Sequence, residues 1–169
     1  INGFGIKVTD SNNVNVLFNN VKDTRDDGIT LRDITGRVYI TDNVVGAEDG
    51  STLVDGNGIS LYRTNFAYIL RNHVYNTNTV ETDHASGIYL KDSSSNVVGD
   101  LGNGNYIRNA DWDGIKVDGG SNNYVRYNDI ANSTRVGVYG VATNDLLVQD
   151  NLIRNSGTTA GIGFEYGRN

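Results

Sequence analysis

A glycine followed by a β-branched residue and a short alternating strand recurs seven times in this chain of 169 residues. The segments begin at Gly5, Gly28, Gly58, Gly87, Gly114, Gly137 and Gly161, at spacings of 23, 30, 29, 27, 23 and 24 residues. Between them recurs an Asn-x-Ile/Val element, at Asn19, Asn43, Asn72, Asn105, Asn128 and Asn151. Each repeat predicts two or three short strands separated by Asn- and Gly-containing turns, without helical periodicity.

A repeat of this length cannot bury its own apolar face, so the copies are expected to stack. We therefore predict an all-β solenoid of parallel strands, with six to seven rungs of 23–30 residues and inward Ile, Val and Leu. The absence of Pro agrees with this prediction, because a stacked central strand needs every N–H donor. We expect a single domain over residues 1–169, as a fragment or mature part of a longer chain.

The composition excludes several classes of protein. The chain has no Cys, which excludes disulfides and thiolate sites. The net charge of −6 argues against nucleic acid and anionic membrane surfaces as partners. No apolar run approaches the roughly 20 residues that a membrane-spanning helix needs, so we expect no membrane insertion.

One full repeat shows the pattern most clearly. It begins with Gly114-Ile115-Lys116-Val117 and continues to Asn128-Asp129-Ile130-Ala131-Asn132. This pattern resembles the right-handed parallel β-helix repeats of the pectate-lyase-like superfamily, and is most similar to those of mannuronan C5-epimerases and related alginate-active proteins. The resemblance covers nearly the whole chain and implies a secreted or cell-surface protein that binds or modifies an acidic polysaccharide. The Tyr-Gly-Phe-Asp-Pro-His-Glu stretch of those epimerases has no counterpart here, so their catalytic residues are not transferred.

Alternation in the strand after each Gly predicts which side chains face outward. The first and third residues face the core, and the second and fourth face solvent. The outward positions include a basic and aromatic set: Arg32, Tyr62, Tyr89, Lys91, Lys116 and Tyr139. Lys and Arg pair with carboxylates, and Tyr and Trp rings pack on sugar faces. We predict polysaccharide binding by Arg32, Tyr62, Arg63, Trp112 and Tyr139; the alternative is a solvated face on which tyrosines shield the backbone.

Removal of the C5 proton of a uronate requires a base, a proton donor and neutralisation of the carboxylate. We predict His84 or Tyr89 as base or acid, with Lys91, Lys116 or Arg63 neutralising the carboxylate. The predicted catalytic set is therefore His84, Tyr89, Lys91 and Lys116. The alternative is that His84 and its neighbour Asp83 form an ordinary exposed loop pair.

The segments before each Gly vary in length and are acidic in the middle rungs, and solenoid insertions often lie on the binding face. Asp27, Asp55, Asp111 and Asp113 are candidate ligands for Ca²⁺, which takes about 6–8 oxygen ligands. The alternative is that these carboxylates serve only the turns in which they lie.

Two functions remain open on the sequence. The first is a polysaccharide-binding or -modifying β-helix of the uronate epimerase or lyase type. The second is a non-catalytic structural solenoid, such as an adhesin, fibre or filament subunit. The ends resemble open rungs, whose sheet edges are expected to be covered or paired, so end-to-end self-association is a further expectation.

Overall fold

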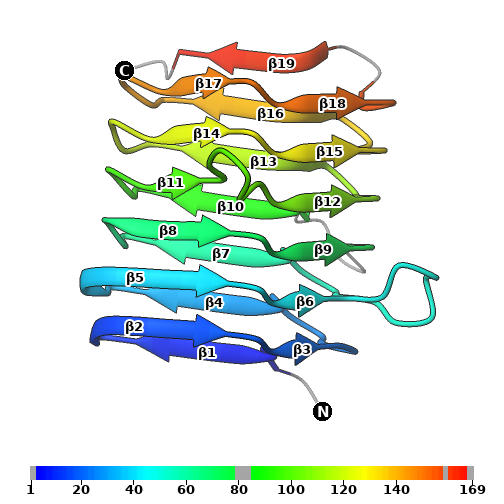
Figure 1. Cartoon of the computed structure of the whole chain (residues 1–169), viewed down its shortest axis with the longest axis horizontal. Coiled ribbons are helices and arrows are strands. Elements are labelled where there is room, and N and C mark those ends of the chain that lie inside the picture. The colour runs from blue at the N-terminus through cyan, green and yellow to red at the C-terminus, as the bar shows by residue number, and fades with distance from the viewer. Residues whose placement is uncertain (1–2, 79–84, 158–159, 167–169) are drawn as a thin grey trace.

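The computed structural model describes residues 3–78, 85–157 and 160–166 (Figure 1). It consists of parallel strands arranged in three sheets. Every strand of the first sheet, sheet A, begins within one residue of a repeated glycine. Sheet A contains β1 (Ile6–Thr9), β4 (Ile29–Arg32), β7 (Ile59–Tyr62), β10 (Ile88–Lys91), β13 (Asp113–Asp118), β16 (Val136–Val141) and β19 (Ala160–Glu165).

The other two sheets come from the second half of each repeat. Sheet B contains β2 (Asn12–Leu17), β5 (Thr35–Thr41), β8 (Ala67–Leu70), β11 (Val97–Val98), β14 (Tyr124–Arg126) and β17 (Leu147–Gln149). Sheet C contains β3 (Asn20–Val21), β6 (Val44–Val45), β9 (His73–Tyr75), β12 (Tyr106–Arg108), β15 (Asp129–Ala131) and β18 (Leu152–Arg154).

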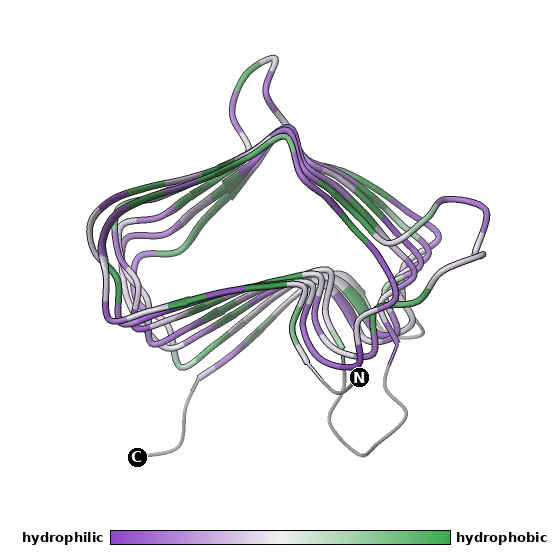
Figure 2. Ribbon diagram, turned by 90° about the horizontal axis from the view of Figure 1, so that it is seen from below, coloured by the Kyte–Doolittle hydropathy of each residue, from purple (hydrophilic) through white to green (hydrophobic). Residues whose placement is uncertain are grey.

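Each turn of the chain contributes one strand to each sheet, and the turns stack into a solenoid with a three-sided cross-section (Figure 2). The pairing is parallel and in register, so Ile29, Ile59, Ile88 and Ile115 stack upon one another. All four are fully buried. The predicted parallel β-helix of six to seven rungs is confirmed, and the rungs share one apolar core.

Close approach of neighbouring rungs explains the repeated glycine. At Gly58, an added Cβ would lie 2.2 Å from Cγ1 of Val74 and 2.6 Å from the carbonyl oxygen of Gly87. Gly87 and Gly114 meet the next rung in the same way. The repeat therefore requires glycine because no side-chain atom fits between the rungs, and not because of a left-handed backbone.

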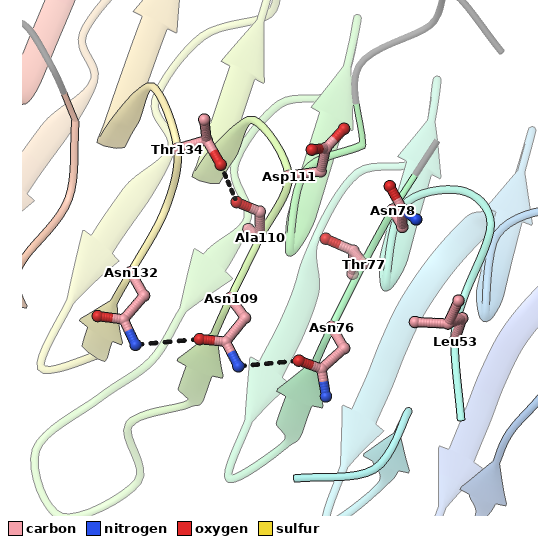
Figure 3. Close-up of a pocket in the computed structure, with 9 residues that line it drawn as sticks. All are labelled: Leu53, Asn76, Thr77, Asn78, Asn109, Ala110, Asp111, Asn132 and Thr134. Carbon is pink, nitrogen blue, oxygen red and sulfur yellow. Dashed lines mark hydrogen bonds between the residues drawn. The ribbon is translucent and has the colours of Figure 1, made fainter. Parts of the chain in front are cut away.

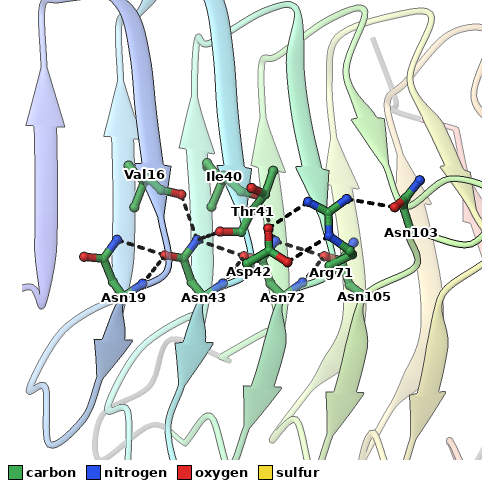
Figure 4. Close-up of polar contacts among 10 residues, drawn as sticks. All are labelled: Val16, Asn19, Ile40, Thr41, Asp42, Asn43, Arg71, Asn72, Asn103 and Asn105. Atoms are coloured by element: carbon green, nitrogen blue, oxygen red, sulfur yellow. Dashed lines mark hydrogen bonds and ion pairs between the residues drawn. The ribbon is translucent and has the colours of Figure 1, made fainter.

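A ladder of buried asparagines lies at the corner between sheets B and C (Figure 4). Nδ2 of Asn72 donates to Oδ1 of Asn105 at 3.0 Å and to the carbonyl oxygen of Ile40 at 2.8 Å. Oδ1 of Asn72 accepts from Nδ2 of Asn43 at 2.9 Å and from the backbone N–H of Asn43 at 3.1 Å. The same contacts continue through Asn19, Asn43, Asn72, Asn105, Asn128 and Asn151. These are the recurring asparagines of the sequence, and they satisfy backbone groups that the corner would otherwise bury.

The connections between strands differ in length, while the strands keep their register. The connection after β6 extends away from the solenoid (Figure 1). Within the part of the chain that the structure describes, no helix is long and apolar enough to cross a membrane.

Candidate functional site

Two columns of side chains cross the outer face of sheet A, one residue from each rung. In the first column, strand pairing aligns Lys7, Thr30, Ser60, Tyr89, Lys116, Tyr139 and Gly163. In the second it aligns Thr9, Arg32, Tyr62, Lys91, Asp118, Val141 and Glu165. The register predicted from the glycine repeat is therefore the observed register, and we call Arg32, Tyr62, Tyr89, Lys91, Lys116 and Tyr139 the basic–aromatic strip.

The middle of this strip is a packed aromatic and cationic cluster. The rings of Tyr62 and Tyr89 meet edge to face, with their centroids 5.8 Å apart. The guanidinium carbon of Arg32 lies 4.6 Å from the centroid of Tyr62, and Nζ of Lys116 lies 5.1 Å from that of Tyr89. Aromatic pairs and cation–π contacts of this kind hold side chains in defined positions, so the strip is ordered by its own contacts.

Asp118 compensates the positive charge at the centre of the strip. Its carboxylate lies 3.0 Å from Nζ of Lys91 and 3.7 Å from Nζ of Lys116. The hydroxyl of Tyr89 donates to the same carboxylate at 3.2 Å. The side chain of Lys91 is 38% exposed, so its ammonium group, which has three donors, remains accessible to a second anion.

The two central phenols are held in their protonated form. Burial, followed by the charge of Asp27, raises the pKa of Tyr62 to about 12. Burial, followed by the charge of Asp118, raises the pKa of Tyr89 well above its ordinary value. At neutral pH these phenols can donate a proton or hydrogen bond, but they are poor bases.

Asp27 lies beneath the strip and is 5% exposed. Its carboxylate accepts hydrogen bonds from the Thr30 hydroxyl at 2.9 Å and from the backbone and side-chain N–H groups of Asn57 at 2.7 and 3.0 Å. Burial is the largest effect on its pKa, which is raised. The outward-facing Thr30 and Ser60 are themselves buried, so this end of the face is covered rather than freely solvated.

A buried ion pair lies beside the other end of the strip. Asp113 is completely buried, and its carboxylate accepts from Nε of Arg135 at 3.0 Å and from Nη2 at 2.5 Å. Burial raises the pKa of Asp113, and the hydrogen bonds and charge of Arg135 oppose this effect. Sequence reasoning did not identify Arg135. The sequence did contain a signal for this pair: Arg135 lies two residues before Gly137, and Asp113 lies directly before Gly114, the equivalent glycine of the preceding rung.

Aromatic rings fix the position of the Arg135 guanidinium. Its central carbon lies 4.9 Å from the ring of Trp112 and 3.9 Å from the ring of Tyr139. The Tyr139 hydroxyl donates to the carboxylate of Glu165. The side chain of Arg135 is 25% exposed, so it extends the cationic character of the strip, and Trp112 packs beside it.

The remaining predicted residues lie apart from this arrangement. Arg63 has a left-handed backbone, with φ of 46°, at the corner after β7, and its guanidinium makes two 2.7 Å hydrogen bonds to Asp33 of the preceding rung. Asp55 and Asp111 lie in connections that lead to sheet A, and both are partly exposed. His84 lies outside the described residues.

The predicted calcium ligands do not gather at one place. Among residues 3–78, 85–157 and 160–166, no group of three or more His, Cys, Asp or Glu side chains could hold a metal ion. The carboxylate of Asp113 is bound by Arg135, and that of Asp27 by Asn57 and Thr30. This donor arrangement does not fit Ca²⁺, which takes about 6–8 oxygen ligands.

The sequence matches two family models. Residues 78–169 match the model described as right handed beta helix region, and residues 2–102 match the model described as periplasmic copper-binding protein (NosD). No curated protein matches the chain in sequence.

Solved structures with the same fold include those of a periplasmic alginate epimerase, AlgG. A double mutant of AlgG matches 98% of this chain with a TM-score of 0.77 and 19% identity, and this chain covers 36% of that one. A single mutant matches 88% of this chain with a TM-score of 0.71 and 21% identity, with 32% of that chain covered. At these identities the likeness concerns the fold, and the present chain spans about a third of the length of those proteins.

Proposed function

Because the chain belongs to the right-handed β-helix family and, over residues 2–102, to the family of periplasmic copper-binding (NosD) proteins, we propose that it binds an acidic polysaccharide along the outer face of sheet A. The observation that carries this proposal is the in-register alignment of the basic–aromatic strip across neighbouring rungs. An extended polymer can lie across the strands, with cations pairing its carboxylates and rings packing on its sugars.

Lys91, Lys116 and Arg135 are the groups that we assign to carboxylate recognition. The two lysines share Asp118, so a polymer carboxylate binds as a second anion beside this internal one. Arg135 is held by Asp113 and by the rings of Trp112 and Tyr139. A guanidinium that is positioned before the ligand arrives loses less side-chain entropy on binding than a free one.

For a reaction at C5 of a uronate, we assign His84 as the base and Tyr89 as the proton donor. A proton donor must be protonated at neutral pH, and the Tyr89 phenol meets this condition; its raised pKa argues against a role as base but does not make it a stronger acid. The base takes the C5 proton while Lys91 and Lys116 neutralise the carboxylate. Epimerisation is completed when the Tyr89 hydroxyl delivers a proton to the opposite face of C5. In the lyase alternative, the C4–oxygen bond breaks and the leaving oxygen takes the proton.

A non-catalytic solenoid is the second candidate. The observation in its favour is that the acid–base groups of the described strip are engaged with one another: Tyr89, Lys91 and Lys116 all contact or approach Asp118. In this case the same face binds a polymer without changing it, as an adhesin or fibre subunit would.

We propose a location outside the cytoplasm, in the periplasm or at the cell surface, which agrees with the periplasmic proteins of similar fold. No copper function is proposed. The chain lacks Cys and Met, the soft ligands that favour copper. Among the described residues the single imidazole, that of His73, has its Nδ1 2.9 Å from the hydroxyl of Tyr75.

The test is binding and turnover on polymannuronate, polyguluronate and polygalacturonate. Binding is measured by calorimetry, and turnover by the absorbance of unsaturated product and the anomeric proton signals. We expect Lys116→Ala to weaken polyuronate binding at least several-fold and the exposed Lys22→Ala, which lies outside sheet A, to leave it unchanged. Equal effects of the two substitutions would exclude the strip as the binding site.

Binding without turnover on all three polymers would favour the non-catalytic candidate. Turnover that is undiminished in His84→Ala would exclude His84 as the base.

A further inference from the structure

A polar groove lies where the chain turns from sheet C towards sheet A, apart from the basic–aromatic strip (Figure 3). It has a volume of about 260 Å³ and is formed mainly by three successive rungs. Its base is a row of asparagines with left-handed backbones: Asn76, Asn109 and Asn132, with φ of 51°, 57° and 59°. Nδ2 of Asn109 donates to Asn76 at 2.8 Å, and Nδ2 of Asn132 donates to Asn109 at 3.0 Å.

The lining of this groove is neutral and hydrogen-bonding, apart from one carboxylate. Asn78, Asp111 and Thr134 lie beside the amide row, and Leu53, which is 44% exposed, forms an apolar wall. Among the described residues that line the groove, none is Lys, Arg or His. Anionic ligands are therefore disfavoured here, in contrast to the face of sheet A, whereas a ligand that both donates and accepts hydrogen bonds is favoured.

One polar group in the groove wall has no partner within the described chain. Thr77 is 2% exposed, and its Oγ1 has no hydrogen-bond partner. Figure 3 shows Thr77 between Asp111 and Asn76 in the wall. Oγ1 of Thr77 is not alone in this: Oγ of Ser133, which follows Asn132 as Thr77 follows Asn76, is likewise buried without a partner. This orphan is therefore a repeated feature of the wall, and the groove is defined by the amide row, Asp111 and Leu53.

We propose that this groove binds a neutral saccharide through its hydroxyl groups. Sugar hydroxyls donate and accept, as the amide row requires, and a pair of vicinal hydroxyls can donate to the Asp111 carboxylate. The apolar C–H face of a pyranose ring packs on Leu53. The site goes beyond the proposed function, because it takes an uncharged sugar on a different part of the solenoid.

The test is an NMR titration of the ¹⁵N-labelled chain with mannotetraose and cellotetraose, and separately with oligomannuronate. We expect a neutral saccharide to shift the side-chain amide signals of the three asparagines and not the backbone signal of Lys116. Asn109→Gly removes the central amide and keeps a residue that tolerates the left-handed backbone. We expect it to weaken neutral-saccharide binding at least tenfold and to leave oligomannuronate binding unchanged, while Lys116→Ala has the opposite pattern.

Absence of amide shifts with both neutral saccharides at millimolar concentration would overturn the proposal. It would also be overturned if the Asn109→Gly variant bound the neutral saccharide as tightly as the unaltered chain does, or if the substitution weakened the binding of the neutral saccharide and of oligomannuronate equally. Neutral-saccharide binding together with no oligomannuronate binding would support this site and refute the proposed function of sheet A.

Discussion

Replacing Asn72 by alanine tests whether the buried asparagine ladder stabilises the solenoid. The substitution removes four hydrogen bonds of the side chain, to Asn43, Asn105 and Ile40. The N–H of Asn43 and the carbonyl of Ile40 then lose the partner that this side chain provides. Each buried polar group left without a partner costs about 1–3 kcal/mol, so the two together predict a loss of about 2–6 kcal/mol.

The assay is urea unfolding followed by circular dichroism, together with hydrogen exchange of the amides in the neighbouring rungs. The matched control is Asn109→Gly, which removes an exposed amide from the row formed by Asn76, Asn109 and Asn132. We expect it to lower the free energy of unfolding by about 1 kcal/mol or less. Protection should fall first near Asn43 and Ile40, because contacts in a solenoid are between neighbouring repeats. A loss for Asn72→Ala no larger than that of the control would refute the reasoning.

Three further predictions follow from the packing and the ion pairs. Arg135→Ala leaves the charge of the fully buried Asp113 uncompensated and should lower the free energy of unfolding by about 3–5 kcal/mol at neutral pH. Burial raises the folded pKa of Asp113 above 3.8, so at acid pH this carboxyl becomes neutral and thermal unfolding should show a smaller loss of stability. A loss of stability that does not depend on pH would contradict this explanation. Gly58→Ala places a Cβ 2.6 Å from the Gly87 carbonyl and should cost about 1–3 kcal/mol or more in urea unfolding, whereas Gly3→Ala, where no atom lies within 4 Å, should be neutral. In an ultraviolet titration of the tyrosines, a transition near pH 12 should be present in the unaltered chain and absent in Tyr62→Phe. If the two titration curves show no such difference, the conclusion that burial raises the pKa of Tyr62 is wrong.

The register of the outer face of sheet A could be read from the sequence because two rules act together. Side chains alternate along a strand, and glycine is required at the start of the sheet A strands, where an added Cβ would meet the next rung, as at Gly58 and Gly87. Differences in repeat length are absorbed by the connections. The alignment of Tyr89 with Lys116 therefore follows from counting residues after each glycine.

The polar groups around that face could not be placed by counting. Counting residues places Asp118 in the second outward column but does not reveal that it binds Lys91 and accepts a hydrogen bond from Tyr89. The sequence predicts that Arg63 binds polysaccharide together with Arg32 and Tyr62, yet the chain turns at Arg63 and its guanidinium binds Asp33. Spacing along the chain does not encode how far a long side chain reaches or which neighbouring rung it contacts.

The sequence by itself determined the architecture, because the glycine and asparagine repeats specify where strands start, where corners turn and which residues share a column. Only the tertiary structure decided the electrostatics of the face. It buried Asp27 and Asp113, gave the latter Arg135 as a partner, and left Thr77 without one. The physical reason is that periodicity controls the direction of a side chain, whereas burial and charge pairing depend on the connections that fold over it.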